Sequence, residues 1–247
     1  MPNTIQEVID NIDTIINWSR EHQSPVGYFA MLYRRMTVAV KQGIQNNLFE
    51  DGKRMEQLDI VFASRYLQAW NAFSRQQRCT NAWYTCFEAC GNKKLIVLQH
   101  LVAGVNAHIN LDLGIAAAQV APDDAIFALE HDFNKINDVI ASLTQAIQDS
   151  LCAIWFPVRA LQSIVNNQQD AVLNFSIVAA RRASWANALA LSHMPAAMQE
   201  THINTIDSAV VTIAGRIFNP GLVTEMLLYP VREMENKEVS RNIDLLQ

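Results

Sequence analysis

Apolar residues recur every three or four positions along almost the whole chain, a spacing that places them on one side of an α-helix. Tight β-turns need glycine and proline, but the sequence has only 8 glycines and 7 prolines among 247 residues. We therefore predict an all-α fold, a bundle of about eight to ten helices. The expected helices span 5–20, 26–47, 53–77, 81–90, 94–118, 122–156, 158–165, 170–191, 195–217 and 222–241.

Composition gives no reason to divide the chain into several domains. Hydrophobic residues make up 50% of it and charged residues 17%, so nearly every segment has enough apolar surface to become ordered. A chain of this length can form one core, and we expect a single helical domain over 1–247. The formal net charge is −5 and the basic residues are scattered. Without a basic patch to displace counterions, nucleic acid is not the expected partner.

The most apolar stretch, 95–120, raises the question of membrane insertion. It contains several polar residues that are costly in hydrocarbon, so we interpret it as the central core helix, at about 94–118, and expect no membrane insertion. The N-terminus shows no basic segment followed by an apolar one, which argues against a secretory signal. The four cysteines lack the paired spacing of a zinc site. We therefore expect reduced thiols in a soluble, cytoplasmic protein.

The central helix carries its polar residues in two pairs. At about 100° per residue, His108 and Asp112 share one side of the helix, and Asn106 and Asn110 share a nearly opposite side. Buried polar groups need hydrogen-bond partners, so each pair is expected to face a different neighbouring helix. An ionisable pair inside an apolar helix predicts a buried polar site.

The next helix, 122–156, is predicted to contribute to this site. Its apolar stripe includes Phe133, and the borders of that stripe are Asp132 and Asn137. His131 falls on the opposite, solvent-facing side. Asp132 is therefore the better candidate to point inward.

A further contribution is predicted from helix 170–191. Arg182 falls within an apolar stripe that also contains Trp185, whereas Arg181 lies to its side. An unpaired buried charge is costly, about 3–5 kcal/mol when its partner is removed. We therefore expect Arg182 to pair with Asp112 or Asp132.

Residues 107–113 read Ala-His-Ile-Asn-Leu-Asp-Leu, and Asp132-Phe133-x-x-Ile136-Asn137 follow in the next helix. Together these segments resemble the signature of an all-helical family of bacterial proteins known only as a domain of unknown function. The resemblance extends over most of the chain, from Tyr33 and Thr37 through Arg182 and Trp185. It implies a helical fold and draws attention to these positions, but it supplies no activity.

One interpretation of the polar site is catalytic. One divalent metal, such as zinc, manganese or iron, would be held by His108, Asp112 and Asp132. Alternatively, these three residues would act together in acid–base catalysis. With Arg182 as a fourth catalytic residue, the corresponding reaction is metal-assisted hydrolysis of a small molecule. The residues expected to bind the ligand are Asn106, Asn110, Asn137 and Trp185. In the structural alternative, the same polar groups form a satisfied network that fixes the register of the helices.

A different class of function is a non-catalytic protein that binds an apolar small molecule or self-associates. An interior rich in aromatic residues supports it, namely Trp70, Trp83, Tyr84, Trp155, Phe156 and Trp185. The apolar run 226–229, Met-Leu-Leu-Tyr, is the candidate face of a homodimer.

Overall fold

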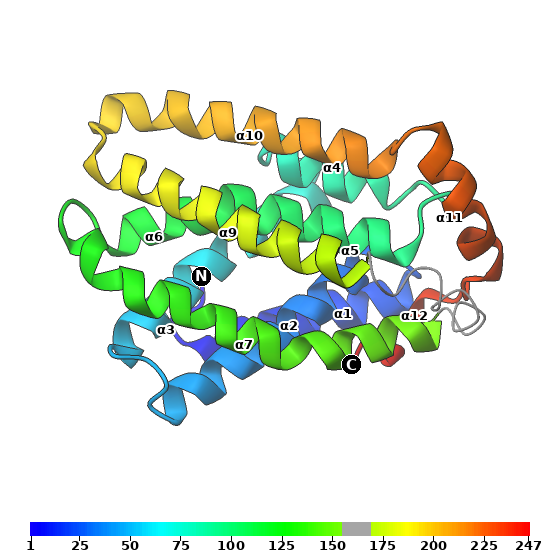
Figure 1. The fold of residues 1–247 in the computed structure, drawn as a ribbon, viewed down its shortest axis with the longest axis horizontal. Helices are drawn as coiled ribbons and strands as arrows, with labels where there is room; N and C mark the ends of the chain where they lie inside the picture. Colours follow the sequence, from blue (N-terminus) through cyan, green and yellow to red (C-terminus); the bar gives the residue numbers. More distant parts are fainter. Residues whose placement is uncertain (155–168) are drawn as a thin grey trace.

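A computed structural model describes residues 1–154 and 169–247, and these residues form helices and no strand (Figure 1). The all-α prediction is confirmed. The helices are α1 (Ile5–Glu21), α2 (Val26–Gln45), α3 (Gly52–Ser74), α4 (Asn81–Ala89), α5 (Val97–Val105), η1 (Asn106–Leu113), α6 (Gly114–Val120), α7 (Ala125–Ile154), α9 (Gln169–His193), α10 (Ala196–Phe218), α11 (Leu222–Met234) and α12 (Val239–Leu245).

A continuous helical rod made of α5, η1 and α6 runs through the middle of the bundle (Figure 1). Helices α9 and α10 pack on one side of it, and α2 and α3 pack on another. By length and composition this rod, Val97–Val120, would also suit a membrane span, but 72% of its most apolar window is buried inside the bundle. Such burial is expected of a core helix in a bundle. The prediction of a central apolar helix is confirmed.

Two glycines let neighbouring helices approach this rod closely. A Cβ atom on Gly104 would lie 2.5 Å from the ring of Phe29 in α2. A Cβ atom on Gly114 would lie 2.7 Å from the carbonyl oxygen of Ser184 in α9. These glycines flank η1, so α2 and α9 are held close to the segment that carries the polar residues.

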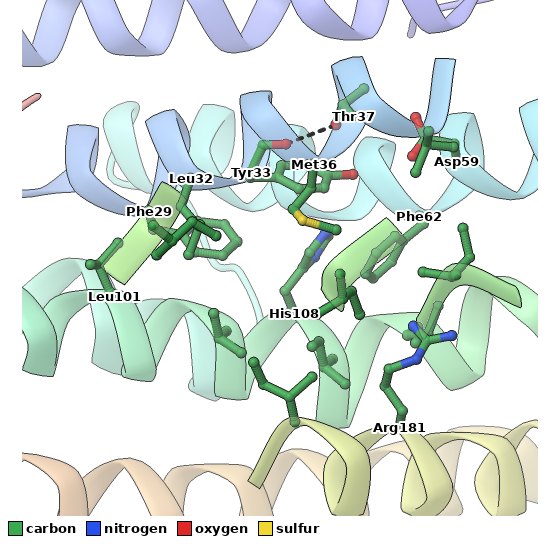
Figure 2. A pocket seen from close by; sticks show the side chains of 18 of the residues that line it. Phe29, Leu32, Tyr33, Met36, Thr37, Asp59, Phe62, Leu101, His108 and Arg181 are labelled. Carbon is green, nitrogen blue, oxygen red and sulfur yellow. Dashed lines mark hydrogen bonds between the residues drawn. The ribbon is translucent and has the colours of Figure 1, made fainter. Parts of the chain in front are cut away.

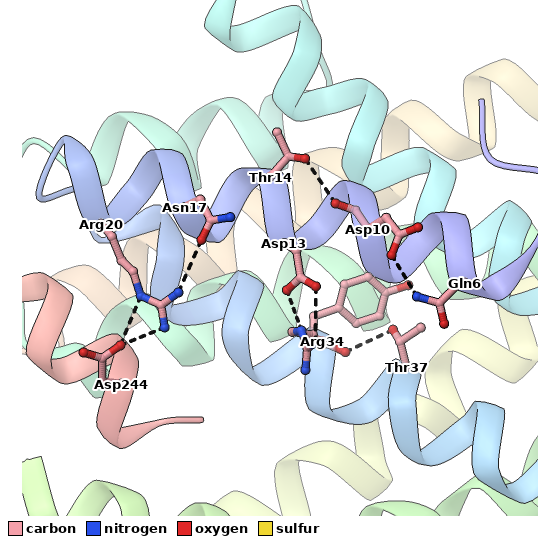
Figure 3. Close-up of polar contacts among 10 residues, drawn as sticks. Gln6, Asp10, Asp13, Thr14, Asn17, Arg20, Arg34, Thr37 and Asp244 are labelled. Atoms are coloured by element: carbon pink, nitrogen blue, oxygen red, sulfur yellow. Dashed lines mark hydrogen bonds and ion pairs between the residues drawn. The ribbon is translucent and has the colours of Figure 1, made fainter.

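Ion pairs on the surface connect α1 to two other helices (Figure 3). Arg34 in α2 donates to Asp13 over 2.5 Å, and Arg20 donates to Asp244 in α12 over 2.7 Å. Because these side chains are partly exposed, each pair stabilises the fold by no more than about 1 kcal/mol. The position of α12 therefore depends mainly on its buried residues, such as Ile243.

The C-terminal region differs from the prediction of one helix over 222–241. It forms two helices, α11 and α12, separated at Glu235, whose backbone is extended (φ −62°, ψ 136°). The buried carboxylate of Glu235 accepts a hydrogen bond from the backbone N–H of Val97 and so caps α5. This tertiary contact ends α11 where helical periodicity alone would continue it.

Helix α11 turns a row of apolar side chains to the solvent. The exposed fractions range from 60% for Tyr229 to 79% for Leu222, and Val223, Met226 and Leu227 lie between. Tyr84, expected in the aromatic interior, is also 50% exposed. The predicted helix 158–165 and the aromatic residues Trp155 and Phe156 lie outside the described residues.

Candidate functional site

The polar residues of the central rod lie on a π-helical segment, η1. In a π-helix the backbone hydrogen bonds run from residue i to i+5, and such segments occur frequently at functional sites. Both predicted pairs are in contact, His108 with Asp112 and Asn106 with Asn110. The structure therefore gathers these side chains at an irregularity of the central helix, which the helical wheel did not predict.

Asp112 is 1% exposed and accepts hydrogen bonds from three side chains. Arg65 of α3 donates to Oδ1 over 2.7 Å, and the indole N–H of Trp83 in α4 donates to Oδ2 over 2.7 Å. The ring of His108 lies on the same Oδ2, with Nδ1 at 3.4 Å. No local pattern in the sequence pointed to Arg65 or Trp83 as partners of Asp112, because both come from other helices.

His108 is held in one orientation by aromatic rings. Its imidazole stacks on Phe62, with ring centroids 3.6 Å apart and an interplanar angle of 11°. Tyr33 meets it edge to face at 4.3 Å. Burial lowers the pKa of His108, so the ring is neutral near pH 7. Packing thus leaves the imidazole little freedom to turn.

The hydrogen bond to Asp112 also fixes the tautomer of His108. A carboxylate can only accept a hydrogen bond, so Nδ1 carries the proton and donates it to Asp112. Nε2 then presents a lone pair, and this buried atom has no hydrogen-bond partner in the described part of the chain. An oriented, unpaired imidazole nitrogen is available to a ligand.

That nitrogen belongs to a residue lining the large pocket drawn in Figure 2. The cavity has a volume of about 210 Å³ and is enclosed by residues of α2, α3, α5, η1, α7 and α9. Most of its walls are apolar side chains, and the polar residues that line it are Tyr33, Thr37, Asp59, His108, Gln148 and Arg181. An apolar cavity with a few converging polar groups is the usual form of a small-molecule site.

Two further groups in this pocket are buried without a complete set of partners. The hydroxyl of Tyr33 and Oδ2 of Asp59 form no hydrogen bond within the described residues. Burial raises the pKa of Asp59 to about 7 and raises that of Tyr33 well above its usual value. Asp59 had no clear signal in the sequence, because it lies only at the border of the apolar stripe of α3.

The two asparagines serve a different contact. Asn110 donates to the side-chain oxygen of Asn106 over 2.9 Å, and Asn106 donates to the carbonyl of Val210 in α10 over 3.0 Å. Neither asparagine lines the pocket. Their prediction as ligand-binding residues is not supported by this position, which instead joins η1 to α10.

The structure does not place Asp132 with His108 and Asp112. Asp132 is fully buried and accepts hydrogen bonds from the backbone N–H groups of Glu50 and Asp51 and from the guanidinium of Arg54. Over the described ranges, no group of three or more histidine, cysteine, aspartate or glutamate side chains is arranged to hold a metal ion. The predicted three-residue metal centre is therefore not supported by this arrangement, in which Asp132 holds the start of α3.

The buried arginine of α9 is Arg181, and the prediction of Arg182 is wrong. Arg181 is 6% exposed, whereas Arg182 is exposed. The face of α9 that packs on the central rod carries Ser184 and Ala188, because only small side chains allow so close an approach. A wheel that follows large apolar residues assigns the wrong face here.

Two predicted residues of this region do contact the pocket wall. Asn137 accepts a hydrogen bond from Arg181 over 2.8 Å, and Trp185 packs on Phe133 with ring centroids 4.8 Å apart. Neither lines the cavity itself. They support Arg181 and Phe133, which do.

Fold and site together define a helical bundle with an internal apolar pocket and an oriented histidine. The chain belongs to the Family of unknown function (DUF5995), whose model matches residues 5–220. This result agrees with the resemblance found in the sequence. No curated protein and no solved structure matches the chain.

Proposed function

We propose that this protein binds an apolar small molecule in the pocket that His108 lines. The observation that carries the proposal is a cavity of about 210 Å³ with apolar walls, lined by His108, whose Nε2 atom has no hydrogen-bond partner among the described residues. For comparison, an engineered apolar cavity of about 150 Å³ is large enough to bind benzene. The pocket therefore suits a molecule somewhat larger than benzene.

The state of His108 indicates what the ligand presents to it. A neutral imidazole with its proton on Nδ1 accepts a hydrogen bond at Nε2. A hydroxyl or amide N–H on the ligand supplies the matching donor. Each such hydrogen bond contributes about 0.5–1.5 kcal/mol, so the apolar walls supply most of the affinity.

The pocket supports binding better than metal-assisted hydrolysis. Both oxygens of Asp112 already accept short hydrogen bonds, from Arg65 and Trp83. The oxygens of Asp132 are bonded to the loop before α3 and to Arg54. His108 therefore has no neighbouring carboxylate oxygen left for a shared metal among the ligands that the sequence suggested.

Calorimetric titration with octanol tests the proposal, since this neutral probe combines an apolar chain with one hydroxyl group. We expect saturable binding at one site, with the negative heat-capacity change that accompanies burial of apolar surface. The Val105→Phe variant should weaken binding at least tenfold, because Val105 is a partly exposed wall residue and a larger side chain there occupies the cavity.

The matched control is Val223→Phe, the same substitution at a position of α11 that is 74% exposed. It should leave octanol binding unchanged. If octanol fails to bind, or if Val105→Phe binds it as tightly as the unmodified protein, the pocket is not the ligand site. Loss of binding in Val223→Phe alone would instead assign the ligand to the apolar face of α11.

A further inference from the structure

Arg181 is a buried cation in the wall of the pocket. It extends from α9 into the cavity from the side opposite Tyr33 and Asp59, with His108 between them (Figure 2). The whole residue is only 6% exposed, which is unusual for arginine. Burial of an arginine normally requires a compensating negative charge.

The partners of Arg181 among the described residues are all neutral. Nε donates to the side-chain oxygen of Asn137 over 2.8 Å, and Nη2 donates to the carbonyl oxygen of Phe133. The guanidinium carbon also lies 4.6 Å from the centroid of the Phe133 ring. These contacts orient the guanidinium, but they do not neutralise its charge.

Among the acidic side chains that the structure describes, none forms an ion pair with Arg181. By contrast, two other arginines form ion pairs with buried carboxylates, Arg54 with Asp132 and Arg65 with Asp112. Although burial lowers the pKa of Arg181 to about 10, the group remains protonated near neutral pH. Arg181 therefore adds an uncompensated positive charge to a largely apolar cavity.

We propose that Arg181 binds the carboxylate of the ligand, and that the ligand is accordingly an apolar carboxylic acid. This inference rests on the proposed function, whose pocket it uses. A guanidinium matches a carboxylate in shape and can donate two parallel hydrogen bonds to it. A single positive charge also balances one carboxylate better than a phosphate dianion. The rest of the acid is apolar apart from the donor that faces Nε2 of His108, and it occupies the remainder of the cavity.

A comparison of octanoate with octanol tests this inference, because the two probes share a chain length and differ in the head group. The unmodified protein should bind octanoate about tenfold to a hundredfold more tightly, the range expected for hydrogen bonds to a charged group. In Arg181→Met, octanoate should lose that advantage while octanol binds as before. Arg181→Lys should retain part of it, because the charge remains but the paired donors are lost.

The neighbouring Arg182→Met variant is the control, since Arg182 is exposed and lies next to Arg181 in the sequence. It should bind both probes like the unmodified protein. Thermal unfolding checks that each variant is folded, and replacement of a buried charge by a hydrophobic residue of similar volume is usually tolerated.

The outcomes separate the two proposals. If octanol binds but octanoate binds no better, or if Arg181→Met retains the preference for octanoate, the carboxylate inference is wrong and the apolar pocket stands. If the unmodified protein binds neither probe, the proposed function fails and the inference fails with it. The comparison of probes in the unmodified protein decides the question even if Arg181→Met does not fold.

Discussion

Asp112 and Asp132 are both buried aspartates with an arginine partner, yet they have different roles in the structure. Asp132 accepts two backbone N–H groups, those of Glu50 and Asp51, and so holds the loop before α3. Asp112 accepts bonds from the side chains of Trp83 and His108, and His108 reaches the pocket. Burial and charge pairing are alike in the two regions. A carboxylate is relevant to a site only when its hydrogen bonds lead to an atom that a ligand can touch.

Among these variants, Asp132→Asn should lower the stability of the protein most. It tests whether Asp132 has a structural role. The amide turns one acceptor into a donor facing a donor and leaves Arg54 without its counter-ion. We expect a loss of about 3–5 kcal/mol in the free energy of unfolding, measured with urea. The folded fraction should still bind octanol normally.

Asp244→Asn is the control for that variant, because it removes an ion pair on the surface with Arg20. It should cost less than about 1 kcal/mol. Equal losses in the two variants would show that Asp132 contributes no more than an exposed ion pair.

Asp59 is a third buried aspartate, and it differs from Asp112 and Asp132 because it has no arginine partner in the described part of the chain. Burial raises its pKa to about 7 in the folded protein from an ordinary value of 3.8, so the folded state binds the proton more tightly than the unfolded state. The associated stability is fully present below pH 3.8 and is lost as the pH rises through about 7.

Asp59→Asn should remove this dependence on pH. The variant should gain stability relative to the unmodified protein as the pH rises, by up to about 4 kcal/mol above the folded-state pKa, since each pH unit contributes about 1.4 kcal/mol. Urea unfolding across the pH range measures the difference. Parallel pH profiles for the two proteins would mean that the carboxyl is already ionised without penalty.

Asp112→Asn should lower the free energy of unfolding by about 1.5–3 kcal/mol, which is less than the loss expected for Asp132→Asn. When the amide oxygen accepts from Arg65, the amide N–H takes the place of Oδ2, where it can donate to Nδ1 of His108 but no longer accepts from Trp83. The proton of His108 then moves to Nε2, so this nitrogen offers the ligand a hydrogen-bond donor in place of an acceptor.

Nitrogen NMR shifts of the imidazole report this change of tautomer. Asp132→Asn is the control variant, because Asp132 has no bond to His108. Its substitution should leave the proton of His108 on Nδ1. An unchanged tautomer in Asp112→Asn would show that Asp112 does not orient the histidine, and the two aspartates would then be equivalent in function.

Local sequence patterns predicted contacts within a single helix. The pairs His108–Asp112 and Asn106–Asn110 are four residues apart, and a helix brings such residues together whatever surrounds it. The same patterns could not predict that η1 is a π-helix, because an α-helical wheel assumes its own periodicity. They also missed Asp59 as a pocket residue, and Arg65 and Trp83 as partners of Asp112.

Hydrophobic periodicity and i,i+4 spacing are local properties of the chain, and they were enough to predict most of the helices, the central apolar rod and the ionisable groups on it. The burial of Arg181 in place of Arg182, and the bonding of Asp132 to a loop and not to the histidine, arise only when the helices pack together. Those outcomes depend on how closely two helices approach. That distance is set by small residues such as Gly114 and Ser184, which carry little signal in a hydrophobic pattern.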